Sequence, residues 1–221
     1  MKTAILVDGA FYRRRAYAAY GDIDPEKRAD ELIKYCHRHL CWHSGRRQQS
    51  ELYRIFYYDC PPLDTAIYHP FLQKNVNLGK SSQYSWALEF FESLRTRRKV
   101  ALRLGELSEV SACYTLKKNL LNKLMRGEKQ ISELVEKDFI FKAEQKGVDM
   151  RIGLDIASMA YKKQVDQIVL ISGDSDFVSA AKLARREGID FILDPLFANT
   201  KPNLREHVDG IRTCDPAFKQ K

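Results

Sequence analysis

Five short runs of apolar, β-branched and aromatic residues occur along the chain and predict the strands of a sheet. The first and the fourth run are apolar at every position rather than at alternate positions, which is typical of strands buried on both faces. The five strands are expected at Ala4–Val7, Tyr53–Tyr58, Val100–Leu104, Ile168–Ile171 and Phe191–Leu193.

Helical patterns lie between these runs. Asp24 followed by Pro25 predicts the start of one helix, because a capping carboxylate and a proline in the first turn both favour it. Another helix is expected from Phe177 to Arg186, closed by Gly188. Strands that alternate with helices predict an α/β fold with a parallel sheet, since parallel neighbours need a crossover connection.

The length of 221 residues favours a single domain over residues 1–221, with an insertion at about 106–147, where the pattern is least regular. This stretch contains a basic amphipathic helix pattern at Lys117–Arg126 and a short apolar run at Phe139–Phe141 that predicts an extra strand. A further short element is expected near Leu204–Ile211.

The composition excludes several classes of protein. With 44% hydrophobic residues the chain is not disordered, and no apolar run is long enough to cross a membrane. The first apolar run stops at Asp8, which is too early for a signal peptide. Five cysteines without a CxxC pair favour a reducing, cytoplasmic location. The net charge of +8 points to a polyanionic partner, whereas nothing in the sequence sets the oligomeric state.

Carboxylates directly follow two of the predicted strands. Asp8 ends the first strand, and Asp174 and Asp176 come after the fourth. Ligands of open parallel sheets bind beyond the carboxyl ends of the strands, and neighbouring strands lie about 4.8 Å apart. If these two strands are neighbours, Asp8 and Asp174 face one small volume, where carboxylates need a cation or a proton to coexist. Hard oxygen ligands favour Mg²⁺ or Mn²⁺, so we predict a site for one of these ions.

A helix that begins near Asp149 is expected to bring a further carboxylate to the same edge. Because this helix leads into the fourth strand, it should run antiparallel to it, with its N-terminus at the carboxyl end of the sheet. Asp149 lies in line with the apolar stripe of the helix, and Asp155 lies about 9 Å further along the axis at the edge of the stripe. This geometry favours Asp149 as a metal ligand and Asp155 as a residue behind the ligands, or as the partner of a buried polar atom.

These aspartates also have a structural interpretation. An aspartate after a strand is often a turn former or a helix N-cap, and Asp174 or Asp176 would suit the helix that starts near Phe177. Their convergence on one edge of the sheet favours the functional interpretation.

Three segments resemble the NYN domain, the LabA-like group within the PIN-like nuclease superfamily. They are Leu6–Phe11, Lys146–Asp149 with Asp155, and Ser172–Phe177, in the order and spacing of the family. The resemblance implies a Rossmann-like parallel sheet of strand order 3-2-1-4-5 with helices on both faces, and an acidic pocket of the metal-dependent ribonuclease type. The acidic residues that it carries over by position are Asp8, Asp149, Asp174 and Asp176, with Asp155 as a further matching acid.

We therefore predict a nuclease, a hydrolase that cleaves the phosphodiester bonds of RNA with one or two Mg²⁺ or Mn²⁺ ions. Asp8 and Asp174 would be the central ligands, and Asp149 and Asp176 would complete the set. One alternative is a non-catalytic RNA-binding or scaffold protein that keeps the fold. The other is a different Mg²⁺-dependent phosphate-processing enzyme, although a Toprim-type site has a glutamate in place of Asp8 and a haloacid dehalogenase has an aspartate in place of Ala10.

Basic residues supply the expected contacts with RNA. Arg13, Arg14 and Arg15 follow Asp8 closely and would hold phosphates at the rim of the site, or would form a solvated helix face. Tyrosines interleave with this run and would stack on bases or pack in the core. A second phosphate-contacting surface is predicted at Lys117, Lys118, Lys123 and Arg126, with Lys129 nearby.

Other polar residues are assigned structural roles. Asp59 and Asp194 also end predicted strands, but both precede chain reversals, so turn formation is expected of each. Asp59 would still reach a substrate from the strand beside Asp8. The cluster of histidines and cysteines between Cys36 and His43 is interpreted as ordinary helix packing rather than as a zinc site.

Overall fold

The computed structural model describes residues 1–41 and 50–219. The chain divides into two compact units. The first unit comprises Met1–Asp59, Glu89–Gly105 and Gly147–Lys221. The second unit comprises Cys60–Leu88 and Glu106–Lys146. The stretch expected as an insertion therefore shares its compact unit with an earlier segment that the sequence pattern did not connect to it.

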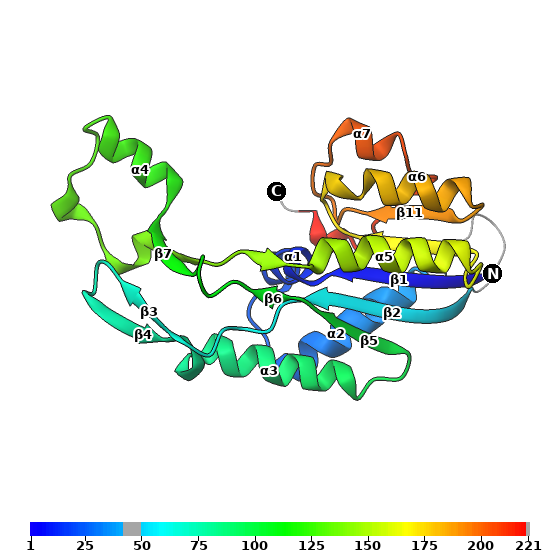
Figure 1. The fold of residues 1–221 in the computed structure, drawn as a ribbon, viewed down its shortest axis with the longest axis horizontal. Coiled ribbons are helices and arrows are strands. Elements are labelled where there is room, and N and C mark those ends of the chain that lie inside the picture. Colours follow the sequence, from blue (N-terminus) through cyan, green and yellow to red (C-terminus); the bar gives the residue numbers. More distant parts are fainter. Residues whose placement is uncertain (42–49, 220–221) are drawn as a thin grey trace. The chain divides into compact units, whose positions relative to one another are not determined.

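The first unit is built on a six-stranded sheet in which every pair of neighbouring strands is parallel (Figure 1). In spatial order the strands are β12 (Gly210–Ile211), β11 (Asp190–Asp194), β10 (Gln167–Ile171), β1 (Lys2–Asp8), β2 (Glu51–Asp59) and β5 (Val100–Leu104). All five predicted strands are present. Their arrangement confirms the expected order 3-2-1-4-5, and the short strand β12 adds a sixth member at one edge.

Helices cover both faces of this sheet, as predicted. Successive residues of a strand point to opposite faces, and Tyr57 and Tyr58 of β2 show which helices lie on each. The Tyr57 ring packs against Phe90 of α3 (Ser82–Arg95), with 5.5 Å between ring centroids. The Tyr58 hydroxyl donates to Asp155 of α5 (Val148–Tyr161) at 2.8 Å. Helices α3 and α5 are therefore on opposite sides of the sheet, and α6 (Val178–Arg186) lies beside α5 (Figure 1).

The ends of several helices follow the predicted signals. Asp24 caps α2 (Pro25–Arg38) by accepting from the Glu26 and Lys27 backbone. The helix predicted from Phe177 begins as a 3₁₀ turn, η4 (Ser175–Phe177), that continues into α6. The other helices of this unit are α1 (Gly9–Tyr20), α7 (Pro202–Arg205) and the 3₁₀ turn η5 (Pro216–Phe218).

The second unit consists of three two-stranded antiparallel pairs and short helices. The predicted basic helix is present as α4, and the predicted extra strand is β8, which pairs with β7. The hairpin formed by β3 and β4 had no signal in the pattern. The strand pairs are β3 (Ala66–His69) with β4 (Lys74–Asn77), β6 (Glu106–Leu107) with β9 (Gln145–Lys146), and β7 (Cys113–Leu116) with β8 (Phe139–Lys142). The helices are α4 (Lys118–Met125) and the 3₁₀ turns η1 (Leu78–Lys80), η2 (Ile131–Glu133) and η3 (Glu136–Asp138).

Among the helices of residues 1–41 and 50–219, none has the length and apolar character needed to cross a lipid bilayer.

Candidate functional site

The two strands that carry the predicted acids are neighbours in the sheet. Val7 of β1 pairs with Ile171 of β10, so the residues that follow leave the sheet at the same edge. The Ser172 hydroxyl donates to Asp8 Oδ2 at 3.1 Å, and the Asp174 backbone N–H donates to the Ser172 hydroxyl at 3.2 Å. Ser172 therefore links the two aspartates that we expect at the centre of the site.

Close backbone packing explains why a glycine stands beside each of these aspartates. A Cβ atom at Gly9 would lie 2.6 Å from Asp59 Oδ2, and one at Gly173 would lie 2.8 Å from the Phe11 ring. Both distances are shorter than a Cβ atom tolerates, so a larger residue would displace the Asp59 carboxylate at Gly9 or the Phe11 ring at Gly173. The two glycines thus allow the Asp59 and Phe11 side chains to pack closely beside Asp8 and Asp174.

Asp8 and Asp174 also perform the structural role that the sequence left open. Asp8 caps α1 by accepting from the Phe11 backbone N–H at 3.1 Å. Asp174 caps η4 by accepting from the Asp176 backbone N–H at 3.0 Å. A carboxylate oxygen has two lone pairs, so each cap bond leaves capacity on the same carboxylate for a second ligand.

The charges of the four predicted acids act on one another, which places the four side chains close together. Burial raises the pKa of Asp8, and the neighbouring charges of Asp59 and Asp174 raise it further, against the hydrogen bonds from Phe11 and Ser172. Asp149 keeps an exposed side chain, but the surrounding protein atoms displace water from it, and this raises its pKa. Asp174, Asp8 and Asp176 add to that rise, in this order.

We expect Asp8→Asn to stabilise the metal-free protein at neutral pH. The pKa of Asp8 in the fold lies above its ordinary value of 3.8, so at a pH between the two values the folded state binds more protons than the unfolded state. The contribution of Asp8 to stability is therefore complete below the unfolded pKa and is lost as pH rises through the folded pKa. Asparagine removes the charge and still caps α1.

Urea unfolding in EDTA at pH 7 and at pH 4 tests this expectation. The gain in unfolding free energy should be clear at pH 7 and smaller at pH 4. An equal gain in unfolding free energy at pH 7 and pH 4, or a loss at pH 7, would show that repulsion between carboxylates does not destabilise the metal-free protein.

The chemistry of these donors fits a hard divalent cation. The four carboxylates form an all-oxygen donor set, which suits Mg²⁺ or Mn²⁺, and a bound cation would relieve the repulsion that helps to raise the pKa of Asp8 and of Asp149. Across the described part of the chain, no three histidine, cysteine or acidic side chains already stand in an arrangement that could hold a metal ion. The capping bonds of Asp8 and Asp174 hold one oxygen of each carboxylate on a backbone N–H group.

The sequence model of the NYN domain matches residues 73–213, well over half of the chain. The chain belongs to the NYN domain family. NYN domains are part of the PIN-like nuclease superfamily, and the mixed α/β architecture with its parallel sheet agrees with that fold. The matched range includes Asp149, Asp174 and Asp176 and begins after Asp8.

Two proteins resemble this NYN domain protein more distantly. The uncharacterized protein y4oD of Sinorhizobium fredii (strain NBRC 101917 / NGR234) is 31% identical over 81 residues, which span 35% of this chain and 38% of that protein. A crystal structure of a protein of unknown function, VPA0982 from Vibrio parahaemolyticus RIMD 2210633, aligns with 98% of this chain and 94% of its own, at 17% identity and a TM-score of 0.48.

Asp155 of the NYN domain lies apart from these contacts. Its Oδ2 atom accepts from the Tyr58 hydroxyl at 2.8 Å and from Arg103 Nε at 3.0 Å. Tyr58 is fully buried, so Asp155 satisfies a buried hydroxyl between α5 and the sheet. We continue to assign Asp155 to the support of the site rather than to the binding of metal.

Asp59 is a further acidic residue beside Asp8, although turn formation is the role that the sequence predicts for it. It ends β2 next to Asp8, its side chain has no exposed surface, and its charge acts on Asp8. Arg13 donates to Asp59 Oδ1 at 2.9 Å and the Tyr57 hydroxyl donates to Oδ2 at 3.0 Å. Its position at the end of the strand beside β1 was a usable signal. In the fold, the Arg13–Asp59 ion pair forms one wall of the acidic site.

The three consecutive arginines have different environments in α1. Arg13 pairs with Asp59, while Arg15 donates to the carbonyl oxygens of Leu196 at 2.6 Å and Phe218 at 2.7 Å. Arg14 has an exposed side chain. The rim role that we predicted for all three is therefore best suited to Arg14, and Arg15 instead anchors the C-terminal segment.

The tyrosines between these arginines divide in the same way. Tyr12 is fully buried and donates to Glu31, and Tyr20 donates to Asp215. Tyr17 is 62% exposed, so it is the tyrosine of α1 that is accessible to a base.

The second predicted basic surface belongs to α4 and its flanks, in the second unit. Lys118, Lys123 and Arg126 are exposed, and Lys117 is half-buried. Arg126 lies 3.7 Å from Glu128, an exposed ion pair that contributes little to stability and leaves the guanidinium accessible.

The histidines and cysteines of α2 behave as packing residues. Cys36 is buried, His37 contacts the Ile33 carbonyl within its own helix, and His39 binds Asp194. His43, the last member of that cluster, lies outside the described residues.

Proposed function

We propose that this NYN domain protein is a metal-dependent ribonuclease that cleaves RNA at the acidic edge of its parallel sheet. The observation that carries the proposal is the convergence of Asp8, Asp149, Asp174 and Asp176 where β1 and β10 end, with charges that act on one another. A family of nuclease-like fold supports the reaction class.

The residues have distinct roles in this proposal. Asp8 and Asp174, linked by Ser172, are the central ligands of Mg²⁺ or Mn²⁺, and Asp149 and Asp176 complete the set. The ion, when bound, activates water for attack on phosphorus and stabilises the charge on the attacking and leaving oxygens. The Arg13–Asp59 ion pair links α1 to β2 beside Asp8, and Ser172 orients the Asp8 carboxylate.

RNA is the proposed substrate because the chain carries a net charge of +8 and offers exposed cations on both units. Cations release condensed counterions when they bind phosphates, and this offsets the repulsion between a carboxylate site and a polyanion. The family match runs through segments of both units, which supports one NYN domain over residues 1–221. All five cysteines are free thiols, which supports the cytoplasm as the location.

A second candidate function is RNA binding without cleavage. It is favoured by one observation, that Asp8 and Asp174 each have a structural role as the cap of a helical turn.

Incubation of single-stranded RNA and DNA oligonucleotides with the protein in Mn²⁺ and in EDTA tests the proposal. We expect cleavage of RNA in Mn²⁺ and none in EDTA. RNA that binds but remains intact at every Mn²⁺ concentration would favour the second candidate. Cleavage that persists in EDTA would show that the reaction does not need a metal ion.

Arg14 and Arg15 should respond differently to replacement by alanine. Arg14→Ala should leave the melting temperature unchanged and weaken RNA binding, with the slope of log K against log salt reduced by about 0.7 for one lost phosphate contact. Arg15→Ala should lower the unfolding free energy by roughly 1–3 kcal/mol, because two carbonyl groups lose a charged donor.

Fluorescence anisotropy at several salt concentrations and thermal unfolding measure both effects. An unchanged salt slope in Arg14→Ala would mean that this arginine belongs to a solvated face and not to an RNA interface.

A further inference from the structure

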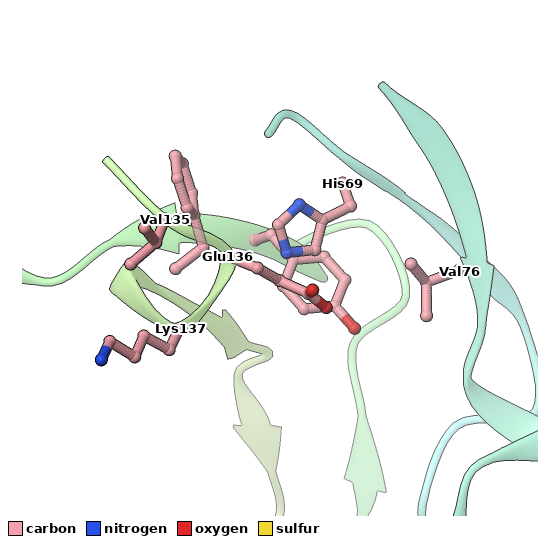
Figure 2. Close-up of a pocket in the computed structure, with 7 residues that line it drawn as sticks. His69, Val76, Val135, Glu136 and Lys137 are labelled. Atoms are coloured by element: carbon pink, nitrogen blue, oxygen red, sulfur yellow. The ribbon is translucent and has the colours of Figure 1, made fainter. Parts of the chain in front are cut away.

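The second unit contains an open cavity of about 620 Å³, and its lining residues do not include the four aspartates Asp8, Asp149, Asp174 and Asp176 (Figure 2). Its walls come from β3, β4, β7 and β8 together with η3, all of which belong to this unit. A cavity of this volume is within the range of small-molecule sites and is large enough for a nucleoside.

One wall of the cavity is aromatic. The ring of His69 lies 4.3 Å from that of Tyr114 and 5.5 Å from that of Phe139, measured between centroids. His69 is buried, whereas Tyr114 and Phe139 keep part of their surface accessible. Strand pairing fixes these rings, since Phe139 is opposite Leu116 and Tyr114 is opposite Phe141 in the β7–β8 pair. The wall is therefore a preformed stacking surface.

Polar groups of both kinds surround this wall. His69 Nδ1 accepts from the Leu72 backbone N–H at 3.4 Å, so the neutral ring carries its proton on Nε2, which is a donor. Glu136 offers carboxylate acceptors. Burial raises the pKa of the Tyr114 phenol, and the nearby charge of Glu136 raises it further. Figure 2 shows the Glu136 side chain extending toward His69, while the Lys137 side chain points away from both.

A basic segment adjoins the cavity within the same unit. Between Lys117 and Lys129 there are five basic side chains and one acidic side chain. The Lys117 backbone N–H donates to the Asp138 carbonyl at 3.0 Å, and Lys129 Nζ lies 3.1 Å from the Asp138 carboxylate. Because Asp138 ends η3 and precedes β8, both ends of the basic segment are tied to elements that line the cavity.

We propose that this cavity binds an unstacked nucleobase of single-stranded RNA, while the cations of α4 bind the phosphates beside it. The ligand is flat, presents donors and acceptors on its edges, and is attached to a polyanionic backbone, so it matches the aromatic wall, the mixed polar groups and the adjacent basic segment together. A peptide with apolar side chains would match the wall but not the charge. The proposal rests on the proposed function in its choice of RNA as the ligand, but it does not depend on cleavage.

A short single-stranded RNA that contains one 2-aminopurine tests this proposal. The protein is used as the full chain with Asp174→Asn, in EDTA, so that the RNA stays intact. Stacking on the aromatic wall should quench the fluorescence of the base. Phe139→Leu and Tyr114→Leu should each abolish most of the quenching and weaken affinity by about 5- to 150-fold, the range measured for the loss of one stacking ring.

Two control variants show whether a loss of quenching comes from the missing ring or from a disturbed fold. Phe139→Tyr keeps the ring and should keep the quenching. Tyr68→Leu removes an exposed aromatic residue of the same unit that is outside the cavity, and it should change nothing. Absence of quenching in the unmutated background, or quenching that survives both leucine variants, would overturn the proposal. Quenching without Mn²⁺-dependent cleavage would instead retain the cavity assignment and reject the ribonuclease.

Discussion

Asp174→Asn should lower the rate of RNA cleavage in Mn²⁺ by more than about 100-fold, the upper end of what the loss of an outer partner of a metal site costs. The larger effect is expected because Asp174 is assigned a direct contact with the ion, and an amide does not supply the negative charge that the ion requires. The fold should persist, since asparagine accepts the Asp176 backbone N–H in the same capping bond. Relief of repulsion from Asp8 and Asp149 should leave the melting temperature equal to that of the wild type or above it.

Asp22→Asn is the matched control for this variant. Asp22 is exposed, so the same change in charge is made away from the acidic edge, and turnover should remain at the wild-type rate. Single-turnover rates at saturating Mn²⁺ compare the three proteins. Cleavage by Asp174→Asn within a few-fold of wild type would reject the catalytic assignment of this residue.

Asp194→Ala should cause the largest loss of stability among the acidic residues discussed above, at least about 3 kcal/mol. The side chain is fully buried and accepts from four groups, two of which lie more than 150 residues earlier in the chain. These donors are the Tyr35 hydroxyl, His39 Nε2 at 2.9 Å, the Leu196 backbone N–H at 2.9 Å and the Thr213 hydroxyl at 2.6 Å. Alanine would leave all four unpaired in the interior, and each unpaired buried donor costs about 1–3 kcal/mol.

Thr213→Val is the comparison for this loss, because it keeps the volume and removes one of the four hydrogen bonds of Asp194, together with the longer bond that Thr213 accepts from the Phe197 backbone N–H at 3.3 Å. It should cost roughly 1 kcal/mol. Thermal and urea unfolding of both variants give the ranking, with a fall in melting temperature on the order of 10 °C for Asp194→Ala. A stability of Asp194→Ala equal to that of Thr213→Val would mean that Asp194 is only a turn former.

A large loss of stability in Asp194→Ala would also explain why the sequence pattern predicts only part of the role of Asp194. Turn formation was expected of Asp194, and its bond with the Leu196 backbone N–H does form such a turn. The larger role depends on Tyr35 and His39, which lie more than 150 residues earlier in the chain. No local pattern carries that information, because the network exists only once α2 packs beside β11.

The predictable part of the fold has a clear physical basis. The runs Ala4–Val7 of β1 and Ile168–Ile171 of β10 are apolar at every position because helices cover both faces of the sheet, and this pattern predicts buried strands. Strand β12 has two residues and β3 and β4 are half-exposed, so neither length nor alternation distinguishes them from loops. The different partners of the three arginines of α1 have a geometric reason. Successive helical residues point about 100° apart, so Arg13, Arg14 and Arg15 face different surroundings.

The position of the acids at one edge was accessible from the sequence, since each of them follows a strand or begins a helix that must return to that edge. The direction of each carboxylate was not accessible. It depends on the hydrogen bonds of Asp8 with Phe11 and Ser172, which form only when β1 and β10 are paired.

Direct measurement of Mn²⁺ binding tests the central claim, that the acidic edge is a metal site. Titration followed by the electron paramagnetic resonance signal of free Mn²⁺ should show binding by the wild type. Asp149→Asn should weaken it strongly. Asp155→Asn, which alters a carboxylate bound to Tyr58 and Arg103, should retain it with a lower melting temperature. Absence of Mn²⁺ binding by the wild type, or its loss in Asp155→Asn but not in Asp149→Asn, would contradict the account.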